Sequence, residues 1–88
     1  MELEGTLIIP QGWFAWFKMP KIAVDKYDGA ELDRPVTYPL ALLDGKGNAN
    51  SIYHFAARKC NGRRIKVNGR FERVIFRKTV CAYEHELC

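Results

Sequence analysis

The chain has 88 residues, a net charge of +4, 48% hydrophobic residues and 27% charged residues. This length and composition predict a single globular domain, residues 1–88, and exclude a disordered chain and a large catalytic scaffold. No apolar run reaches the roughly 18 residues that a membrane-spanning helix needs. The acidic start lacks the basic region of a secretory leader. We therefore expect a cytoplasmic protein with no membrane partner.

Charge is distributed unevenly along the chain. Residues 1–50 contain five Lys or Arg and seven Asp or Glu, a net −2, whereas residues 51–88 contain nine and three, a net +6. This asymmetry favours an anionic partner such as nucleic acid, although a solvated basic face balanced by the acidic half is the alternative. The odd number of cysteines, without a Cys-x-x-Cys pair, predicts no zinc site and favours a cytoplasmic setting.

The N-terminal part predicts two strands, over residues 2–9 and 21–27. Gly5 interrupts the first of these strands, which marks a bulge or a close approach of another backbone. The second strand alternates apolar and polar residues and ends at Asp28-Gly29, a strong turn signal. Residues 29–35 are polar and are expected to form a loop.

Four aromatic side chains fall within residues 13–17, between the two strands. An extended segment would place aromatic rings on both of its faces, so one set fills the core and the other is covered or exposed. The rings are therefore either all buried or form a docking surface. If they are exposed, the anchors for a protein partner are Trp13, Phe14 and Trp16.

The middle of the chain predicts a strand, a loop and a short helix. Residues 36–43 form the strand, and Pro39 inside it indicates an edge or a bulge because proline donates no ladder hydrogen bond. Residues 44–48 form the loop. Residues 51–60 form the helix, capped by Asn50 or Ser51 and ended by Asn61-Gly62. The spacing of its apolar side chains predicts a stripe toward the core: Ile52, Phe55, Ala56 and Lys59.

The C-terminal part predicts a hairpin. Residues 63–67 alternate as a strand, and Asn68-Gly69 is the strongest hairpin turn in the chain. Residues 71–83 then form one long final strand. Strands followed by a helix and a hairpin predict a mainly β fold, a small five-stranded antiparallel barrel (OB-like) with one short helix between strands 3 and 4. The alternatives are an α+β twisted sheet with one helix and an SH3-like barrel with a helical insertion.

The sequence contains no arrangement typical of catalysis. His54 and His85 have no Cys, Asp or Ser at a spacing that defines a nucleophile and its base. The Gly45-Lys46-Gly47 segment lacks the extended frame of a phosphate-binding loop. We therefore expect no enzyme, no cofactor and no metal site.

Basic and aromatic side chains gather near the C-terminal hairpin. Arginines neutralise phosphates and flat rings stack on unpaired bases, so this mixture favours a small module that binds single-stranded DNA or RNA. The alternative function is a protein-interaction module, an assembly subunit or a homodimer, anchored by exposed aromatic residues without nucleic acid. The candidate nucleic-acid-binding residues are Arg63, Arg64, Lys66, Arg70, Phe71, Arg73, Arg77 and Tyr83.

Overall fold

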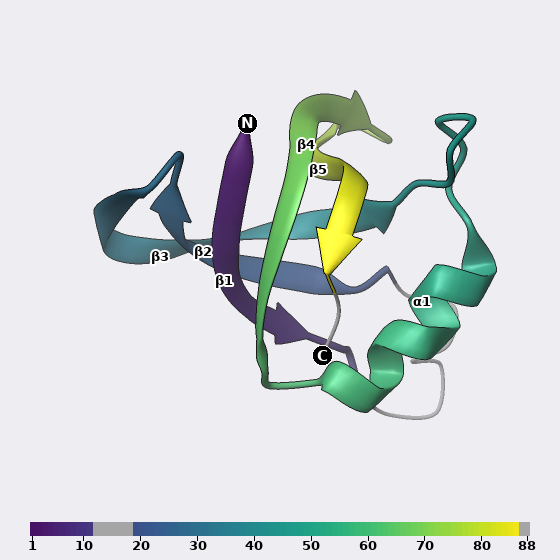
Figure 1. Cartoon of the computed structure of the whole chain (residues 1–88), viewed down its shortest axis with the longest axis horizontal. Coiled ribbons are helices and arrows are strands. Elements are labelled where there is room, and N and C mark those ends of the chain that lie inside the picture. Colours follow the sequence, from purple (N-terminus) through teal and green to yellow (C-terminus); the bar gives the residue numbers. More distant parts are fainter. Residues whose placement is uncertain (12–18, 87–88) are drawn as a thin grey trace.

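The computed structural model describes residues 1–11 and 19–86, and strands make up most of it (Figure 1). The strands are β1 (Glu2–Ile8), β2 (Lys21–Tyr27), β3 (Ala30–Leu42), β4 (Arg64–Val74) and β5 (Arg77–Glu86). Between β3 and β4 lie the helix α1 (Ser51–Ala57) and a 3-10 turn, η2 (Arg58–Cys60). In the described part of the chain, no helix has the length and apolar character to cross a membrane.

The five strands close into a barrel in the order β1-β2-β3-β5-β4. Neighbouring strands are antiparallel, except that β3 and β5 run parallel. Strand β4 returns to pair with β1, and α1 lies outside the barrel beside the start of β4 (Figure 1). The predicted OB-like barrel with one helix between strands 3 and 4 is therefore confirmed. An open twisted sheet is excluded because the closed barrel leaves no edge strand.

Alternate residues of β1 and of the first parts of β2 and β4 fill the barrel interior, as the period of two in the sequence predicts. Gly5 belongs to this inward series, and a register shift falls beside it. A Cβ at this position would meet the backbone of Ala23 and Val24, so the expected bulge and close approach are both confirmed. The main interior side chains are Leu3, Leu7, Ile22, Val24, Leu40, Leu42, Ile65, Val67, Val80 and Ala82.

The turn between β2 and β3 is the predicted one, but the loop expected after it is absent. Asp28 and Gly29 both have positive φ, 49° and 85°, which matches the tight hairpin turn that Asp-Gly favours. Strand β3 begins at Ala30, so the expectation of a loop over residues 29–35 is wrong. Residues 30–36 are all exposed, which explains their polar composition without a break in the strand.

Pro39 stands where β3 changes partner. Up to Pro39 the strand pairs with β2, and from Leu40 to Leu42 it pairs with β5. Leu40 donates its backbone N–H to the carbonyl of Pro20 at 2.9 Å. The expected edge or bulge at Pro39 is therefore replaced by a change of partner, where the missing N–H is tolerated.

Helix α1 begins as predicted but presents a different face to the barrel. Asn50 caps it by accepting a hydrogen bond from the backbone N–H of Ile52 at 2.9 Å. Ile52 and Phe55, which were expected to face the core, are 71% and 70% exposed. The small residues Ala57 and Cys60 are buried instead. These positions also fit the helical period, and their size allows the helix to approach the barrel closely.

The C-terminal hairpin turns at a different place from the one predicted. Strand β4 continues through Asn68-Gly69, where the register shifts and the chain bulges. Gly69 lies so close to the backbone of Cys81 that a Cβ would meet its carbonyl group. The turn is formed instead by Ile75 and Phe76, at φ of 50° and 61°. The predictions of a turn at Asn68-Gly69 and of a single strand over residues 71–83 are therefore wrong.

Candidate nucleic-acid interface

Several of the predicted cations on β4 are paired with carboxylates. Lys66 Nζ lies 3.2 Å from Glu2 Oε1 on β1, and Arg70 Nε lies 3.0 Å from Glu72 Oε1 on its own strand. Both pairs are substantially exposed, so they contribute little to stability. They nevertheless neutralise part of the positive charge that the sequence assigns to this strand.

Arg64 is the most extensively paired of these cations. Its guanidinium contacts both carboxylate oxygens of Asp25 on β2, at 2.7 and 2.9 Å, and Glu4 on β1 at 3.1 Å. The hydrogen bond from Arg64 is the largest cause that lowers the pKa of Asp25 below its ordinary value. Arg64 therefore links β4 to β1 and β2, and its fork of donors is already occupied.

Three cations at the far end of the hairpin have no such partner. Within residues 1–11 and 19–86, no ion pair involves Arg73, Arg77 or Lys78, and we call these residues the free cations. Arg73 lies directly opposite Lys78, whereas Arg77 lies opposite Val74. Because alternate residues share a face, Arg73 and Lys78 lie on the same face of the hairpin as Phe71. Arg63 is also exposed, but it lies just before β4, at the other end of that strand.

Aromatic rings from three strands meet on this face. The Phe71 ring lies 4.9 Å from the Tyr38 ring, and it is stacked with the Tyr27 ring at 6.5 Å and 9° between planes. Lys78 Nζ lies over the Phe71 ring at 4.3 Å and over the Tyr38 ring at 5.7 Å. We call Tyr27, Tyr38 and Phe71 the aromatic cluster. Tyr27 is 40% exposed, so one ring of the cluster is open to solvent.

Sequence reasoning identified Phe71 and missed the other members of this group. Tyr27 comes from the end of β2, Tyr38 from the middle of β3 and Lys78 from β5. No local spacing connects these positions, because only barrel closure brings them together. The alternation along each strand indicates which residues share its face, but not which strands become neighbours.

The tip of the hairpin carries two exposed apolar side chains. Ile75 is 82% exposed and Phe76 is 91% exposed. Arg73 and Arg77 flank this pair in the sequence, with Lys78 one residue further along. The free cations, the aromatic cluster and the apolar tip together form the candidate interface.

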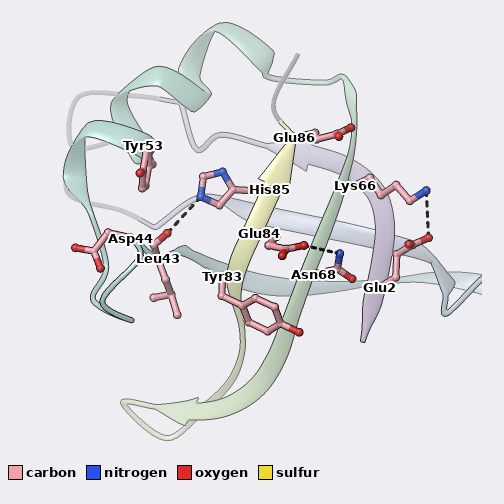
Figure 2. A pocket seen from close by; sticks show the side chains of 11 residues that line it. Glu2, Leu43, Asp44, Tyr53, Lys66, Asn68, Tyr83, Glu84, His85 and Glu86 are labelled. Atoms are coloured by element: carbon pink, nitrogen blue, oxygen red, sulfur yellow. Dashed lines mark hydrogen bonds and ion pairs between the residues drawn. The ribbon is translucent and has the colours of Figure 1, made fainter.

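Tyr83 and Lys66 lie away from this interface, along a hollow of about 560 Å³. Figure 2 shows Tyr83 and Glu84 on β5 beside Lys66 and Asn68 on β4. Asn68 donates a hydrogen bond to Glu84 at 3.2 Å. Lys66 stands among the carboxylates that line the hollow, which repel a phosphate backbone: Glu2, Asp44, Glu84 and Glu86.

The remaining candidates are the protein-interaction anchors and any metal-binding or nucleophilic groups of the described residues. Trp13, Phe14 and Trp16, the candidate protein-interaction anchors, lie outside them. Across residues 1–11 and 19–86, no three His, Cys, Asp or Glu side chains are grouped to hold a metal ion.

Burial, with a smaller contribution from Glu72, raises the pKa of the Cys81 thiol to about 11. Cys81 is therefore protonated at neutral pH and is a poor nucleophile.

Comparison with known proteins adds no functional information to this geometry. No protein-family model, no curated protein and no solved structure matches the chain.

Proposed function

We propose that this protein binds single-stranded nucleic acid through the aromatic cluster and the free cations. The observation that carries the proposal is that Phe71, Lys78 and Arg73 lie together on one face of the β4–β5 hairpin. Cations that no carboxylate neutralises are available to phosphates, and neighbouring rings offer stacking surfaces to unpaired bases. The paired cations of β4 are already neutralised by carboxylates and lie outside the proposed site.

The open ring of the cluster supports this choice of ligand. Tyr27 is stacked with Phe71 on one side of the cluster and remains 40% exposed, so its ring can receive a base. Stacking of one base on an aromatic side chain contributes about 1–3 kcal/mol, which is enough for measurable binding when phosphate contacts add to it. Because the contacts involve ring faces and phosphates, we expect little dependence on base sequence.

The test compares two variants that each remove two positive charges. Arg73→Ala with Lys78→Ala removes charge beside the aromatic cluster. Arg58→Ala with Lys59→Ala removes the same charge from the exposed surface of η2, next to the opposite end of β4. We expect the first variant to bind a fluorescent oligonucleotide about tenfold or more weakly than the wild type, and the second to bind almost normally.

Fluorescence anisotropy at low salt measures the affinities, and circular dichroism confirms that both variants fold. Equal losses in the two variants would mean that only net charge matters and that this face is not the site. Absence of binding by the wild type would reject the proposed function.

A second candidate function is protein interaction, and the outer face of α1 favours it. Ile52 and Phe55 lie on this face with about seven-tenths of their surface exposed. Light scattering tests the simplest case, a homodimer. If α1 forms the dimer interface, the wild type should be a dimer and Phe55→Ser should be a monomer. A monomeric wild type would reject a homodimer.

A further inference from the structure

The turn of the β4–β5 hairpin contains two residues that such turns normally avoid. Ile75 and Phe76 both have positive φ, 50° and 61°. Two-residue turns of this kind favour Asn-Gly, because a side chain with a Cβ is strained at positive φ and a β-branched one is strained most. Such residues persist only where their surroundings compensate for the strain.

Burial does not compensate for this strain. Ile75 and Phe76 are 82% and 91% exposed, so neither side chain gains stability from packing within the described part of the barrel. Both residues are therefore unfavourable in this turn, because their backbone is strained and their apolar side chains are exposed to solvent. Departures of this kind are expected at functional sites, where a bound partner supplies the missing contacts.

The surroundings of the tip indicate the chemistry of that partner. Arg77 directly follows the turn and Arg73 lies two residues before it, and neither has a carboxylate partner among the described residues. A ligand that is complementary to the tip must therefore offer an apolar surface and negative charge within a few ångströms of each other. An unpaired nucleic-acid strand offers both, because base faces alternate with phosphates along it.

We propose that Phe76 stacks on an unpaired base of the strand that the aromatic cluster holds, while Arg73 and Arg77 contact the adjoining phosphates. This inference rests on the proposed function and extends it from the cluster to the end of the hairpin. In a duplex the base faces are covered by their neighbours in the stack, so the tip cannot reach them. The protein should therefore prefer single strands to duplexes of the same sequence.

The decisive variant improves the turn and removes the stacking ring. Ile75→Asn with Phe76→Gly introduces the pair that this turn geometry favours, so the melting temperature should stay the same or rise. Affinity for an oligonucleotide containing 2-aminopurine should fall about five- to fiftyfold, and the quenching of its fluorescence by stacking should be lost. Opposite effects on stability and binding separate a binding role from a structural one.

Single substitutions distinguish stacking from general apolar contact. Phe76→Trp keeps a flat ring and should retain affinity, whereas Phe76→Leu keeps an apolar side chain and should lose it. Tyr83→Ser removes an exposed ring beside the acidic hollow, outside the candidate interface, and should leave binding unchanged.

Several outcomes would overturn the inference. If the wild type binds the oligonucleotide and the Asn-Gly variant binds equally well, the tip has no role although the proposed function holds. Equal binding by the Leu and Trp variants would reject stacking. A wild type that binds no oligonucleotide removes both proposals. A membrane contact would give a different set of results. The wild type would sediment with phosphatidylserine vesicles, the variant with Ile75→Asn and Phe76→Gly would not, and neither would produce a 2-aminopurine response.

Discussion

Gly5 and Gly69 lie where neighbouring backbones of the barrel approach closely. Each is an inward-facing position at which the register shifts, and a Cβ at either would meet main-chain atoms of the adjacent strand. These glycines allow tight closure, because the neighbouring strand cannot withdraw without breaking its own ladder. The sequence indicated this role for Gly5, but Asn68-Gly69 resembles a hairpin turn so closely that the role of Gly69 was missed.

Gly69→Ala should destabilise the barrel strongly. Its Cβ would press on the Cys81 carbonyl and lie 3.0 Å from the Cα of Ala82, so the strands must separate. We expect the free energy of unfolding to fall by about 3 kcal/mol or more. Gly45→Ala is the matched control, because nothing lies within 4 Å of its Cβ and it should change stability by less than about 0.5 kcal/mol. Urea denaturation measures both, and similar values would contradict the close approach.

At the scale of elements, one histidine connects helix α1 to the end of β3. His54 Nε2 accepts a hydrogen bond from the backbone N–H of Leu42 at 3.0 Å, which requires an unprotonated Nε2. Burial, and secondarily the neighbouring His85, lower the pKa of His54 below its ordinary value of 6.5. The helix is therefore attached to the barrel by a bond that protonation breaks.

Stability should fall as the solution becomes acidic. Between the lowered pKa of the folded state and the ordinary pKa of 6.5, the unfolded chain binds more protons than the folded one. The stabilisation is thus present above pH 6.5, decreases as the pH falls below it, and stops decreasing below the folded-state pKa. His54→Gln keeps an acceptor for Leu42 and removes the titration, so its stability should depend less on pH. Denaturation at pH 7.5 and pH 5 provides the comparison, and equal pH dependence would contradict the argument.

At the scale of the whole molecule, barrel closure divides the positive charge into two groups. The cations in the first part of β4 face acids from β1 and β2, whereas those at the far end of the hairpin face none in the described part of the chain. The acidic hollow beside Tyr83 lies on another side of β4 and β5. The distribution of charge thus gives the barrel one face suited to an anion and another that repels it.

Binding should depend on salt to an extent set by the free cations alone. Three phosphate contacts on a single strand predict a slope of about −2 in a plot of log affinity against log salt concentration. Arg73→Ala with Lys78→Ala should reduce the slope to about −0.7. A slope near that of the wild type in this variant, measured by anisotropy over a series of salt concentrations, would show that other cations make the contacts.

Local spacing along the chain was enough to predict β1 and β2, the turn at Asp28-Gly29, a cap at Asn50 or Ser51 and the order of elements in an OB-like barrel. Each of these features depends on neighbours within a few residues, so the pattern contains the necessary information. The same patterns identified the basic and aromatic character of the hairpin. They also led to the wrong turn, because Asn-Gly fits a bulge as well as it fits a hairpin.

Long-range pairing settled the remaining features. Arg64 and Asp25 are 39 positions apart, and the rings of Tyr27, Tyr38 and Phe71 come from three strands. The face that α1 presents to the barrel was also decided by packing, which buries Ala57 and Cys60 and leaves Ile52 and Phe55 exposed. Which cations are neutralised and which rings meet depends on the order in which the strands close, and periodicity within one strand contains no information about its neighbours.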